Sequence, residues 1–322
     1  MFPGQGSQYP AMIERALHLA PDANAPVLAA ASNILGRDLL ACYRSDNPTA
    51  YASEREVHVG VFLANHLYLR MLEASGVRAD LSLGLSVGEY NHLVHIGALE
   101  FGDALRLVDA RGAALDRAPR GLMAAVYPME LTDLEVVVAR ASAYGTLEIA
   151  AYNSPGHHVI SGERRAIQVA LRVLEQEREV QTVVLDSRAA MHSSAAWPVV
   201  PAFVPALQRA AWRAIGRPYL PNAAGRFLSR PTAGDLIYLL TLQVWRPVRW
   251  QQSIEFLSAR YPNAIFVEVG PHVVASGRRG WRPSANLRTD NGRGEDPRLA
   301  FDRVVRALGA VRVGVEAAAY AA

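Results

Sequence analysis

Residues 121–185 switch repeatedly between the alternation typical of strands and the spacing typical of helices, and this order leaves few folds open. The stretch comprises, in order, "GLMAAVYP" as a strand, "LTDLEVVVARASAYG" as a helix, "TLEIAAYN" and "HHVISG" as strands, "ERRAIQVALRVLEQER" as a helix and "VQTVVLD" as a strand. This βαββαβ order is typical of a ferredoxin-like lobe. We therefore expect an α/β protein in which 120–190 form an inserted lobe and 1–119 and 191–322 form the main body.

Local residues also predict where segments begin and end. Thr132 and Glu135 have the spacing of a capping box at the start of the first helix, and Gly145 is a typical helix stop. The stretch "RPSANLRTDNGRGEDP" is rich in turn residues and has no periodicity. It is the one segment that we expect to be a mobile loop.

Size and composition favour a globular protein. The chain has 322 residues, of which 51% are hydrophobic, so it can bury a large core. Its apolar runs are far shorter than the roughly 20 residues that a membrane span needs. The start, "MFPGQGSQYP", has neither the basic region nor the apolar core of a signal peptide, which predicts a cytoplasmic location.

The charged residues exclude several kinds of chemistry. All 33 basic residues are arginine, which excludes a phosphate-loop lysine and a lysine Schiff base. They are spread along the chain, apart from "GRRGWRPSANLR", without the aromatic-interleaved stripe of a nucleic-acid-binding protein. The single cysteine, Cys42, excludes an internal disulfide and a cysteine-rich metal site. We expect no metal, no nucleic-acid partner and no membrane partner.

A candidate nucleophile lies in the stretch "LSLGLSVGEYNHLVHIGAL", which begins at Leu81. Leucines alternate before Ser86 as in a short buried strand, and apolar residues after it recur at helical spacing. Gly84 and Gly88 flank the serine and remove the Cβ atoms that a sharp turn would bring into collision. The pattern is that of a nucleophile elbow, although a G-x-S-x-G match alone is a weak signal.

Eight motifs in order resemble one enzyme family. They are "FPGQGSQ", "GLSVGEY", "ARG", "MAAV", "YNSPGHHVISG", "AMHSS", "QVWRPVRW" and "EVGP". Their order and spacing resemble those of the malonyl-CoA:acyl carrier protein transacylases and the acyltransferases of polyketide synthases. The form "GLS" is closest to that of stand-alone, trans-acting acyltransferases. The resemblance implies an α/β-hydrolase-like body with an inserted ferredoxin-like lobe, which agrees with the lobe predicted from periodicity.

The resemblance also implies how the serine is activated. A serine hydroxyl is a poor nucleophile at neutral pH and needs a base within hydrogen-bond reach. The resemblance assigns Ser86 as the nucleophile and His192, in "AMHSS", as the base. Members of the family orient this histidine through carbonyl oxygens, for which Asn153 and Gln243 occupy the matching motif positions.

Two further features of the family concern the reacting acyl group. The resemblance implies an oxyanion hole made by the backbone N–H groups of Gln5 and Val87. It also implies that Arg111 binds the free carboxylate of a malonyl-type group, because a guanidinium presents two parallel donors. Leu85 and Met191 depart from the residues common at these substrate-binding positions, and the flexible methionine suits a larger acyl group.

The function expected from the resemblance is ping-pong transfer of a malonyl-type group from coenzyme A to the phosphopantetheine thiol of an acyl carrier protein, in polyketide biosynthesis. No bound cofactor is expected; the acyl-CoA and the carrier protein are substrates and partners. Leu85 and Met191 leave open transfer of a bulkier, for example amino-acylated, group between two carrier proteins. An editing thioester hydrolase is a second alternative, against which Arg111 argues, and a silent docking protein is another, against which Ser86 and His192 argue.

Overall fold

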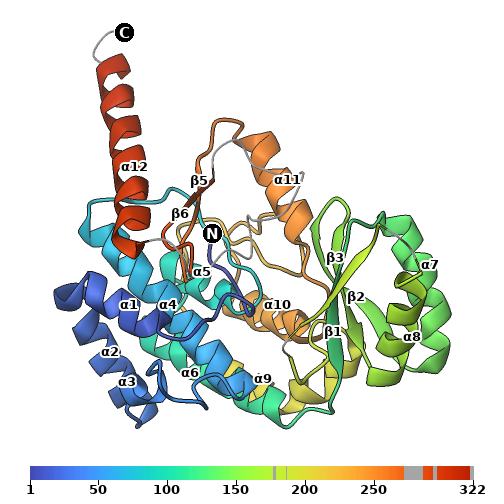
Figure 1. Ribbon diagram of the computed structural model, residues 1–322. Coiled ribbons are helices and arrows are strands. Elements are labelled where there is room, and N and C mark those ends of the chain that lie inside the picture. The colour runs from blue at the N-terminus through green and yellow to red at the C-terminus, as the bar shows by residue number, and fades with distance from the viewer. Residues whose placement is uncertain (177–178, 186, 272–285, 293–295, 320–322) are drawn as a thin grey trace.

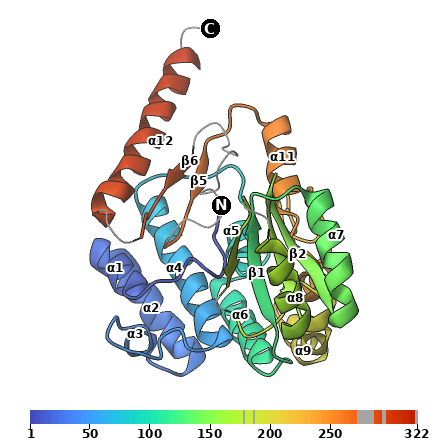
Figure 2. The same ribbon diagram turned by 45° about the vertical axis from the view of Figure 1, so that its right-hand side comes forward.

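The computed structural model describes residues 1–176, 179–185, 187–271, 286–292 and 296–319 of the mixed α/β chain. A helix-rich body contains the chain start, and a smaller lobe lies beside it (Figures 1 and 2). Within these ranges, no helix is both long enough and apolar enough to span a bilayer.

The lobe contains the six segments predicted for residues 121–185, and their order is confirmed. Its elements are β1 (Leu122–Tyr127), α7 (Leu131–Ala141), β2 (Leu147–Ser154), β3 (His157–Gly162), α8 (Arg164–Leu174) and β4 (Gln181–Val184). The strands form one antiparallel sheet in the order β2-β3-β1-β4. Helices α7 and α8 pack on the sheet face that points away from the body and enclose a core of their own (Figure 1).

The predicted capping box in the lobe is wrong. Helix α7 begins at Leu131, so Thr132 already lies inside its first turn, and the N-cap Glu130 makes no side-chain capping bond. The start is determined by tertiary contacts instead: Met129 N–H donates to the carbonyl of Gly156 at 2.9 Å, and Leu131 packs against the lobe core. The predicted stop is close to the observed one, since Gly145 follows the short 3-10 helix that ends α7.

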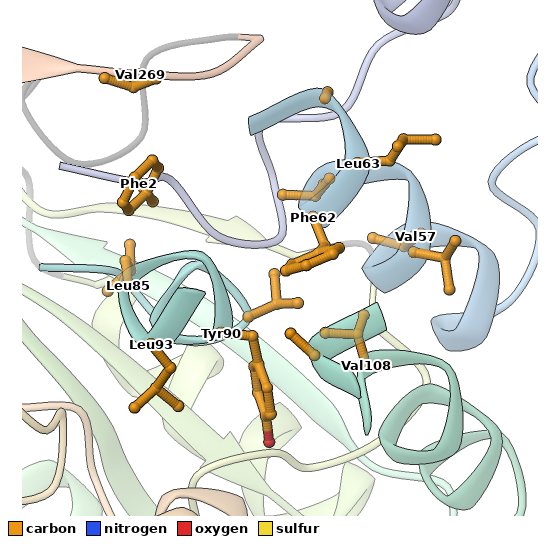
Figure 3. Close-up of a cluster of buried hydrophobic side chains, with 14 of the residues drawn as sticks. Phe2, Val57, Phe62, Leu63, Leu85, Tyr90, Leu93, Val108 and Val269 are labelled. Carbon is orange, nitrogen blue, oxygen red and sulfur yellow. The ribbon is translucent and has the colours of Figure 1, made fainter. Parts of the chain in front are cut away.

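The body is built around helix α4, which is buried along most of its length. Its helices are α1 (Met12–Leu19), α2 (Pro21–Leu35), α3 (Leu39–Cys42), α4 (Glu54–Ala74), α5 (Gly88–His95), α6 (Phe101–Asp116), α9 (Val200–Arg209), α10 (Ala233–Trp245), α11 (Trp250–Arg260) and α12 (Pro297–Ala319). A 3-10 helix, η2 (Ser194–Val199), precedes α9. The labels in Figure 3 show Phe62 of α4 and Tyr90 of α5 in the apolar space between these helices and α6.

Short parallel strands cross the body beside the chain start. Strands β5 (Phe266–Glu268) and β6 (Asn286–Arg288) pair in parallel, and the Met1 ammonium donates to the Val267 carbonyl at 2.7 Å. On its other side the chain start pairs with the segment before the elbow, because Phe2 N–H donates to the Leu83 carbonyl and the Phe2 carbonyl accepts from Leu85 N–H, both at 2.9 Å. The strand predicted before Ser86 is therefore reduced to one parallel bridge.

The prediction of a mobile loop near the C-terminus, 282–297, is wrong for the parts that the structure describes, since Pro297 begins α12 and 286–292 make buried contacts. The segment 286–292 contains β6 and the buried Asp290, whose carboxylate accepts hydrogen bonds from Tyr68 at 2.7 Å and Arg15 at 3.1 Å and a third from Tyr9. These partners come from α1, α4 and the loop before α1, so no local pattern revealed them. Residues 282–285 and 293–295 of the predicted loop lie outside the described residues.

Candidate active site

Ser86 lies at a sharp turn directly before helix α5. Its φ angle of 51° is in the left-handed region that non-glycine residues seldom adopt. A Cβ atom on Gly84 would collide with the carbonyl of Gly88, and a Cβ atom on Gly88 would collide with the carbonyl of Phe2. Both flanking glycines are therefore required for the turn, as the G-x-S-x-G pattern predicts.

The turn brings Ser86 Oγ within 2.8 Å of His192 Nε2. His192 follows the lobe in sequence, and its backbone N–H donates to the Val244 carbonyl at 3.0 Å at the end of α10. Burial and the nearby charge of Arg111 lower the pKa of His192 to about 3, while backbone groups of Gln243 and Arg246 act in the opposite direction. The imidazole is therefore neutral at pH 7 and able to accept the serine proton.

Side chains from distant segments fix the backbone of the turn. Asn222 Oδ1 accepts from Ser86 N–H at 2.7 Å, and Asn222 Nδ2 donates to the Gly84 carbonyl at 2.6 Å. Gln243 Nε2 donates to the Ser86 carbonyl at 2.9 Å and to Glu89 at 2.6 Å. Burial raises the pKa of Glu89 to about 7, although hydrogen bonds from the Tyr219 hydroxyl and from Gln243 oppose that shift. This buried network holds the backbone of Ser86 at both its N–H and its carbonyl.

We expect Asn222→Ala to destabilise the protein and slow the reaction of Ser86. The substitution leaves the buried Ser86 N–H and Gly84 carbonyl without partners, at a cost of about 2 to 4 kcal/mol in the free energy of unfolding. Urea unfolding measures this cost, and Asn33→Ala on the exposed face of α2 is the matched control. An unfolding free energy equal to that of the wild type contradicts a role for Asn222 in holding the turn.

The two residues expected to form the oxyanion hole lie on either side of Ser86. Val87 follows the serine at the N-terminus of α5 and is fully buried. Gln5 belongs to the glycine-rich loop at the chain start, in which a Cβ atom on Gly4 would contact the Leu85 carbonyl and Ser86 Cβ. Asn65 of α4 holds this loop by donating to the Pro3 carbonyl at 2.9 Å. The loop therefore packs directly against the serine turn.

Arg111 is a fully buried cation, and only one of its three guanidinium nitrogens has a hydrogen-bond partner within the described residues. Its Nη1 lies 3.2 Å from His58 Nδ1, whereas Nε and Nη2 have no hydrogen-bond partner among the described residues. Burial lowers the pKa of the guanidinium, and tyrosine and glutamate charges oppose that shift. By contrast, Arg106, Arg117 and Arg120 are exposed. A buried guanidinium with two free donors is suited to bind a carboxylate in bidentate fashion.

The remaining predicted site residues are all buried, but they differ in how directly they contact Ser86 and His192. Leu85 and Met191 directly precede Ser86 and His192, and both are buried. The Gln243 side chain is directed to Ser86 and Glu89, so only its backbone acts on the histidine. Asn153 is buried at the end of β2, and no hydrogen bond between it and His192 is present in the part of the chain that the structure describes. Across that same part, no group of three or more potential metal ligands occurs.

Sequence analysis missed several residues of the site. Glu89 lies inside the quoted "GLSVGEY" motif, where a carboxylate on a buried helix was a usable signal. His58 interrupts the apolar run of α4, "VHVGVFLANHL", which was a second signal. Asn222 and Tyr219 gave none, because they reach Ser86 and Glu89 from more than 120 positions along the chain.

Comparison with known proteins identifies one family over most of the chain. The model of the family described as acyl transferase domain matches residues 1–287. A malonyl CoA-acyl carrier protein transacylase of Bacillus subtilis is 27% identical over 281 residues, which cover 86% of this chain and 87% of that protein. A polyketide biosynthesis malonyl CoA-acyl carrier protein transacylase of Bacillus velezensis is 31% identical over 281 residues, covering 86% of this chain and 93% of that protein.

A solved structure extends the likeness to the fold. The crystal structure of a malonyl CoA-acyl carrier protein transacylase from Clostridium perfringens superposes with a TM-score of 0.87 at 26% identity, covering 98% of each chain. The family match includes the turn at Ser86, the buried Arg111 and His192. The chain belongs to the acyl transferase domain family.

Proposed function

We propose that this protein is a serine acyltransferase that moves a malonyl-type group from coenzyme A to the phosphopantetheine thiol of an acyl carrier protein, in polyketide biosynthesis. The observation that carries the proposal is the neutral Ser86–His192 pair beside the unpaired donors of buried Arg111. The names of the relatives, a malonyl CoA-acyl carrier protein transacylase and a polyketide biosynthesis malonyl CoA-acyl carrier protein transacylase, support the same substrate class.

The proposed first half-reaction acylates Ser86. Its Oγ attacks the thioester carbonyl while its proton passes to His192 Nε2, 2.8 Å away. Negative charge then develops on the carbonyl oxygen, where the backbone N–H groups of Gln5 and Val87 are proposed to donate hydrogen bonds, each worth about 3 to 4 kcal/mol. The tetrahedral intermediate collapses, the C–S bond breaks, and His192 returns the proton to the leaving thiolate of coenzyme A.

The second half-reaction runs the same steps in reverse with a different thiol. The phosphopantetheine thiol of the carrier protein gives its proton to His192 and attacks the acyl-serine carbonyl. The ester bond to Ser86 Oγ breaks, and the serine oxygen recovers the proton from the imidazole. One histidine serves both steps. Because the acyl group stays on Ser86 between them, the enzyme alternates between a free and an acylated form, as ping-pong transfer requires.

The proposal assigns the choice of acyl group to Arg111. A malonyl carboxylate satisfies its free Nε and Nη2 donors, whereas a neutral acyl group leaves a buried cation unpaired. Water in place of the carrier thiol would give the editing hydrolase. We infer that carboxylate binding in this site disfavours that outcome by filling the space beside Ser86.

We also propose how the two parts of the fold relate to the site. The sheet order β2-β3-β1-β4 with two helices on one face supports a ferredoxin-like lobe, for which we propose the range 120–190. The serine turn and the short parallel strands around Met1–Pro3 support an α/β-hydrolase-like body made of 1–119 and 191–322. Ser86 comes from the first part of the proposed body, and His192 lies near the start of its second part.

We expect Arg111→Ala to reduce acylation of Ser86 by malonyl-CoA by about 3 to 5 kcal/mol in kcat/KM, since one partner of a buried ion pair is lost. The same variant gains relative activity toward acetyl-CoA. Rates of acyl-enzyme formation, followed by intact-protein mass spectrometry, test both statements, with exposed Arg117→Ala on the same helix end as control. A wild type that prefers acetyl-CoA or an amino-acylated carrier protein over malonyl-CoA contradicts the malonyl assignment.

A further inference from the structure

His58 is a buried histidine that the proposed reaction does not use. It lies on α4 with no exposed surface, and its ring contacts two residues of the site. Its Nε2 is 3.1 Å from the side-chain oxygen of Gln5, and Arg111 Nη1 lies 3.2 Å from its Nδ1 and 3.3 Å from its Nε2. One side chain therefore joins the loop that carries Gln5 to the guanidinium.

The imidazole of His58 is neutral in this position. Burial, the adjacent Arg111 cation and His192 all hold the pKa of His58 well below its ordinary value. A neutral imidazole has one N–H donor and one acceptor nitrogen. With the proton on Nε2, the ring donates to Gln5 and leaves Nδ1 to accept from Arg111 Nη1, which lies almost equally close to both ring nitrogens.

The packing of two helices fixes this contact. Helices α4 and α6 approach closely at Gly112, where a Cβ atom would collide with the backbone of Arg55. The neighbouring residue on α6 is Arg111, and one turn along α4 from Arg55 is His58. The close approach places His58 beside Arg111 and in contact with Nη1, while Nε and Nη2 have no partner in the part of the chain that the structure describes.

We propose that His58 is a positioning residue that orients Arg111 and thereby sets the preference for acyl groups with a free carboxylate. This inference rests on the proposed function. With Nη1 against His58, the guanidinium presents its Nε and Nη2 edge, which is the edge that forms two parallel bonds to a carboxylate. Without His58, the side chain of Arg111 turns freely and the second bond is lost.

The test compares two donors on two variants. In His58→Phe, which keeps an aromatic ring and removes both hydrogen bonds, acylation by malonyl-CoA falls by about 10-fold to 100-fold, a typical penalty for a misplaced binding group. Acylation by acetyl-CoA changes less than about threefold, since that donor has no carboxylate to place. His58→Gln recovers most of the malonyl rate, because an amide both donates and accepts. The rates come from intact-protein mass spectrometry, as for Arg111.

A matched control lies on the same helix. His66 is buried two turns further along α4 and stacks on Phe101 with ring centroids 4.3 Å apart, away from the serine. His66→Phe therefore changes a buried histidine of α4 in the same way, and we expect it to leave the ratio of malonyl to acetyl rates as in the wild type. Thermal unfolding of each variant separates a folding defect from a change in donor preference.

Three results overturn the inference. If malonyl-CoA acylates His58→Phe at the same rate as the wild type, the role of His58 is rejected and the proposed function still stands. Equal losses with both donors in a well-folded His58→Gln assign the residue to general packing. A wild type that takes acetyl-CoA and refuses malonyl-CoA rejects the proposed function, and the inference with it.

Discussion

Ser86→Ala is expected to abolish the covalent acyl-enzyme while leaving the fold intact. The hydroxyl is the only group removed. We propose that its hydrogen bond to His192 Nε2, at 2.8 Å, serves the reaction and not the packing of the hydrophobic core. The backbone of the turn keeps its bonds to Asn222 and Gln243. Intact-protein mass spectrometry after incubation with malonyl-CoA measures the loss, and Ser229→Ala, an exposed serine, is the control.

The contradicting outcome is specific. If Ser86→Ala still gains the mass of the acyl group, another side chain is the nucleophile and the turn at residue 86 has a structural role only. If both the variant and the wild type fail to gain that mass but still transfer the acyl group, the reaction proceeds without an acyl-serine.

His192→Ala is expected to slow acylation by about a hundredfold to ten-thousandfold, the range for loss of a positioned general base. Burial and Arg111 keep the pKa of His192 at about 3 in the free protein, so the imidazole is neutral, as the proposed transfer of the serine proton to it requires. The acyl-serine still forms, slowly, since Ser86 remains. Stopped reactions analysed by mass spectrometry give the rate.

The exposed His18, in the last turn of α1, is the matched control for this substitution. We expect His18→Ala to keep the wild-type rate of acylation. A near-normal rate in His192→Ala shows that the 2.8 Å contact with Ser86 does not carry the proton transfer.

Local patterns predicted the lobe and the serine turn because local forces determine them. Apolar residues recur at strand or helix spacing within each segment of 121–185, and every segment except β4, whose Val183 and Val184 are exposed, buries that face against its neighbours. At Ser86, the flanking glycines are needed for steric reasons within five residues of chain. The capping box failed because contacts of Met129 and Leu131 with the rest of the lobe outweigh a cap worth about 1 kcal/mol.

The supporting parts of the site depend on contacts between distant segments, which no local pattern encodes. Asn222 meets Ser86 across 136 positions, and His58 meets Arg111 across 53. Strand β6 lies within a stretch that has the composition of a loop. The adjacent Asp290 is held there by buried hydrogen bonds from Arg15 of α1 and Tyr68 of α4. Such residues become visible only when the fold brings their partners together.

The most direct test of the account is to charge the wild-type protein with malonyl-CoA, record its intact mass, and then add a phosphopantetheinylated acyl carrier protein. We predict that the malonyl group appears on Ser86, located by peptide mapping, and then leaves the enzyme and appears on the carrier thiol. A protein that acquires no acyl group from malonyl-CoA, or that releases free malonate instead of charging the carrier, contradicts transfer by a malonyl-serine intermediate.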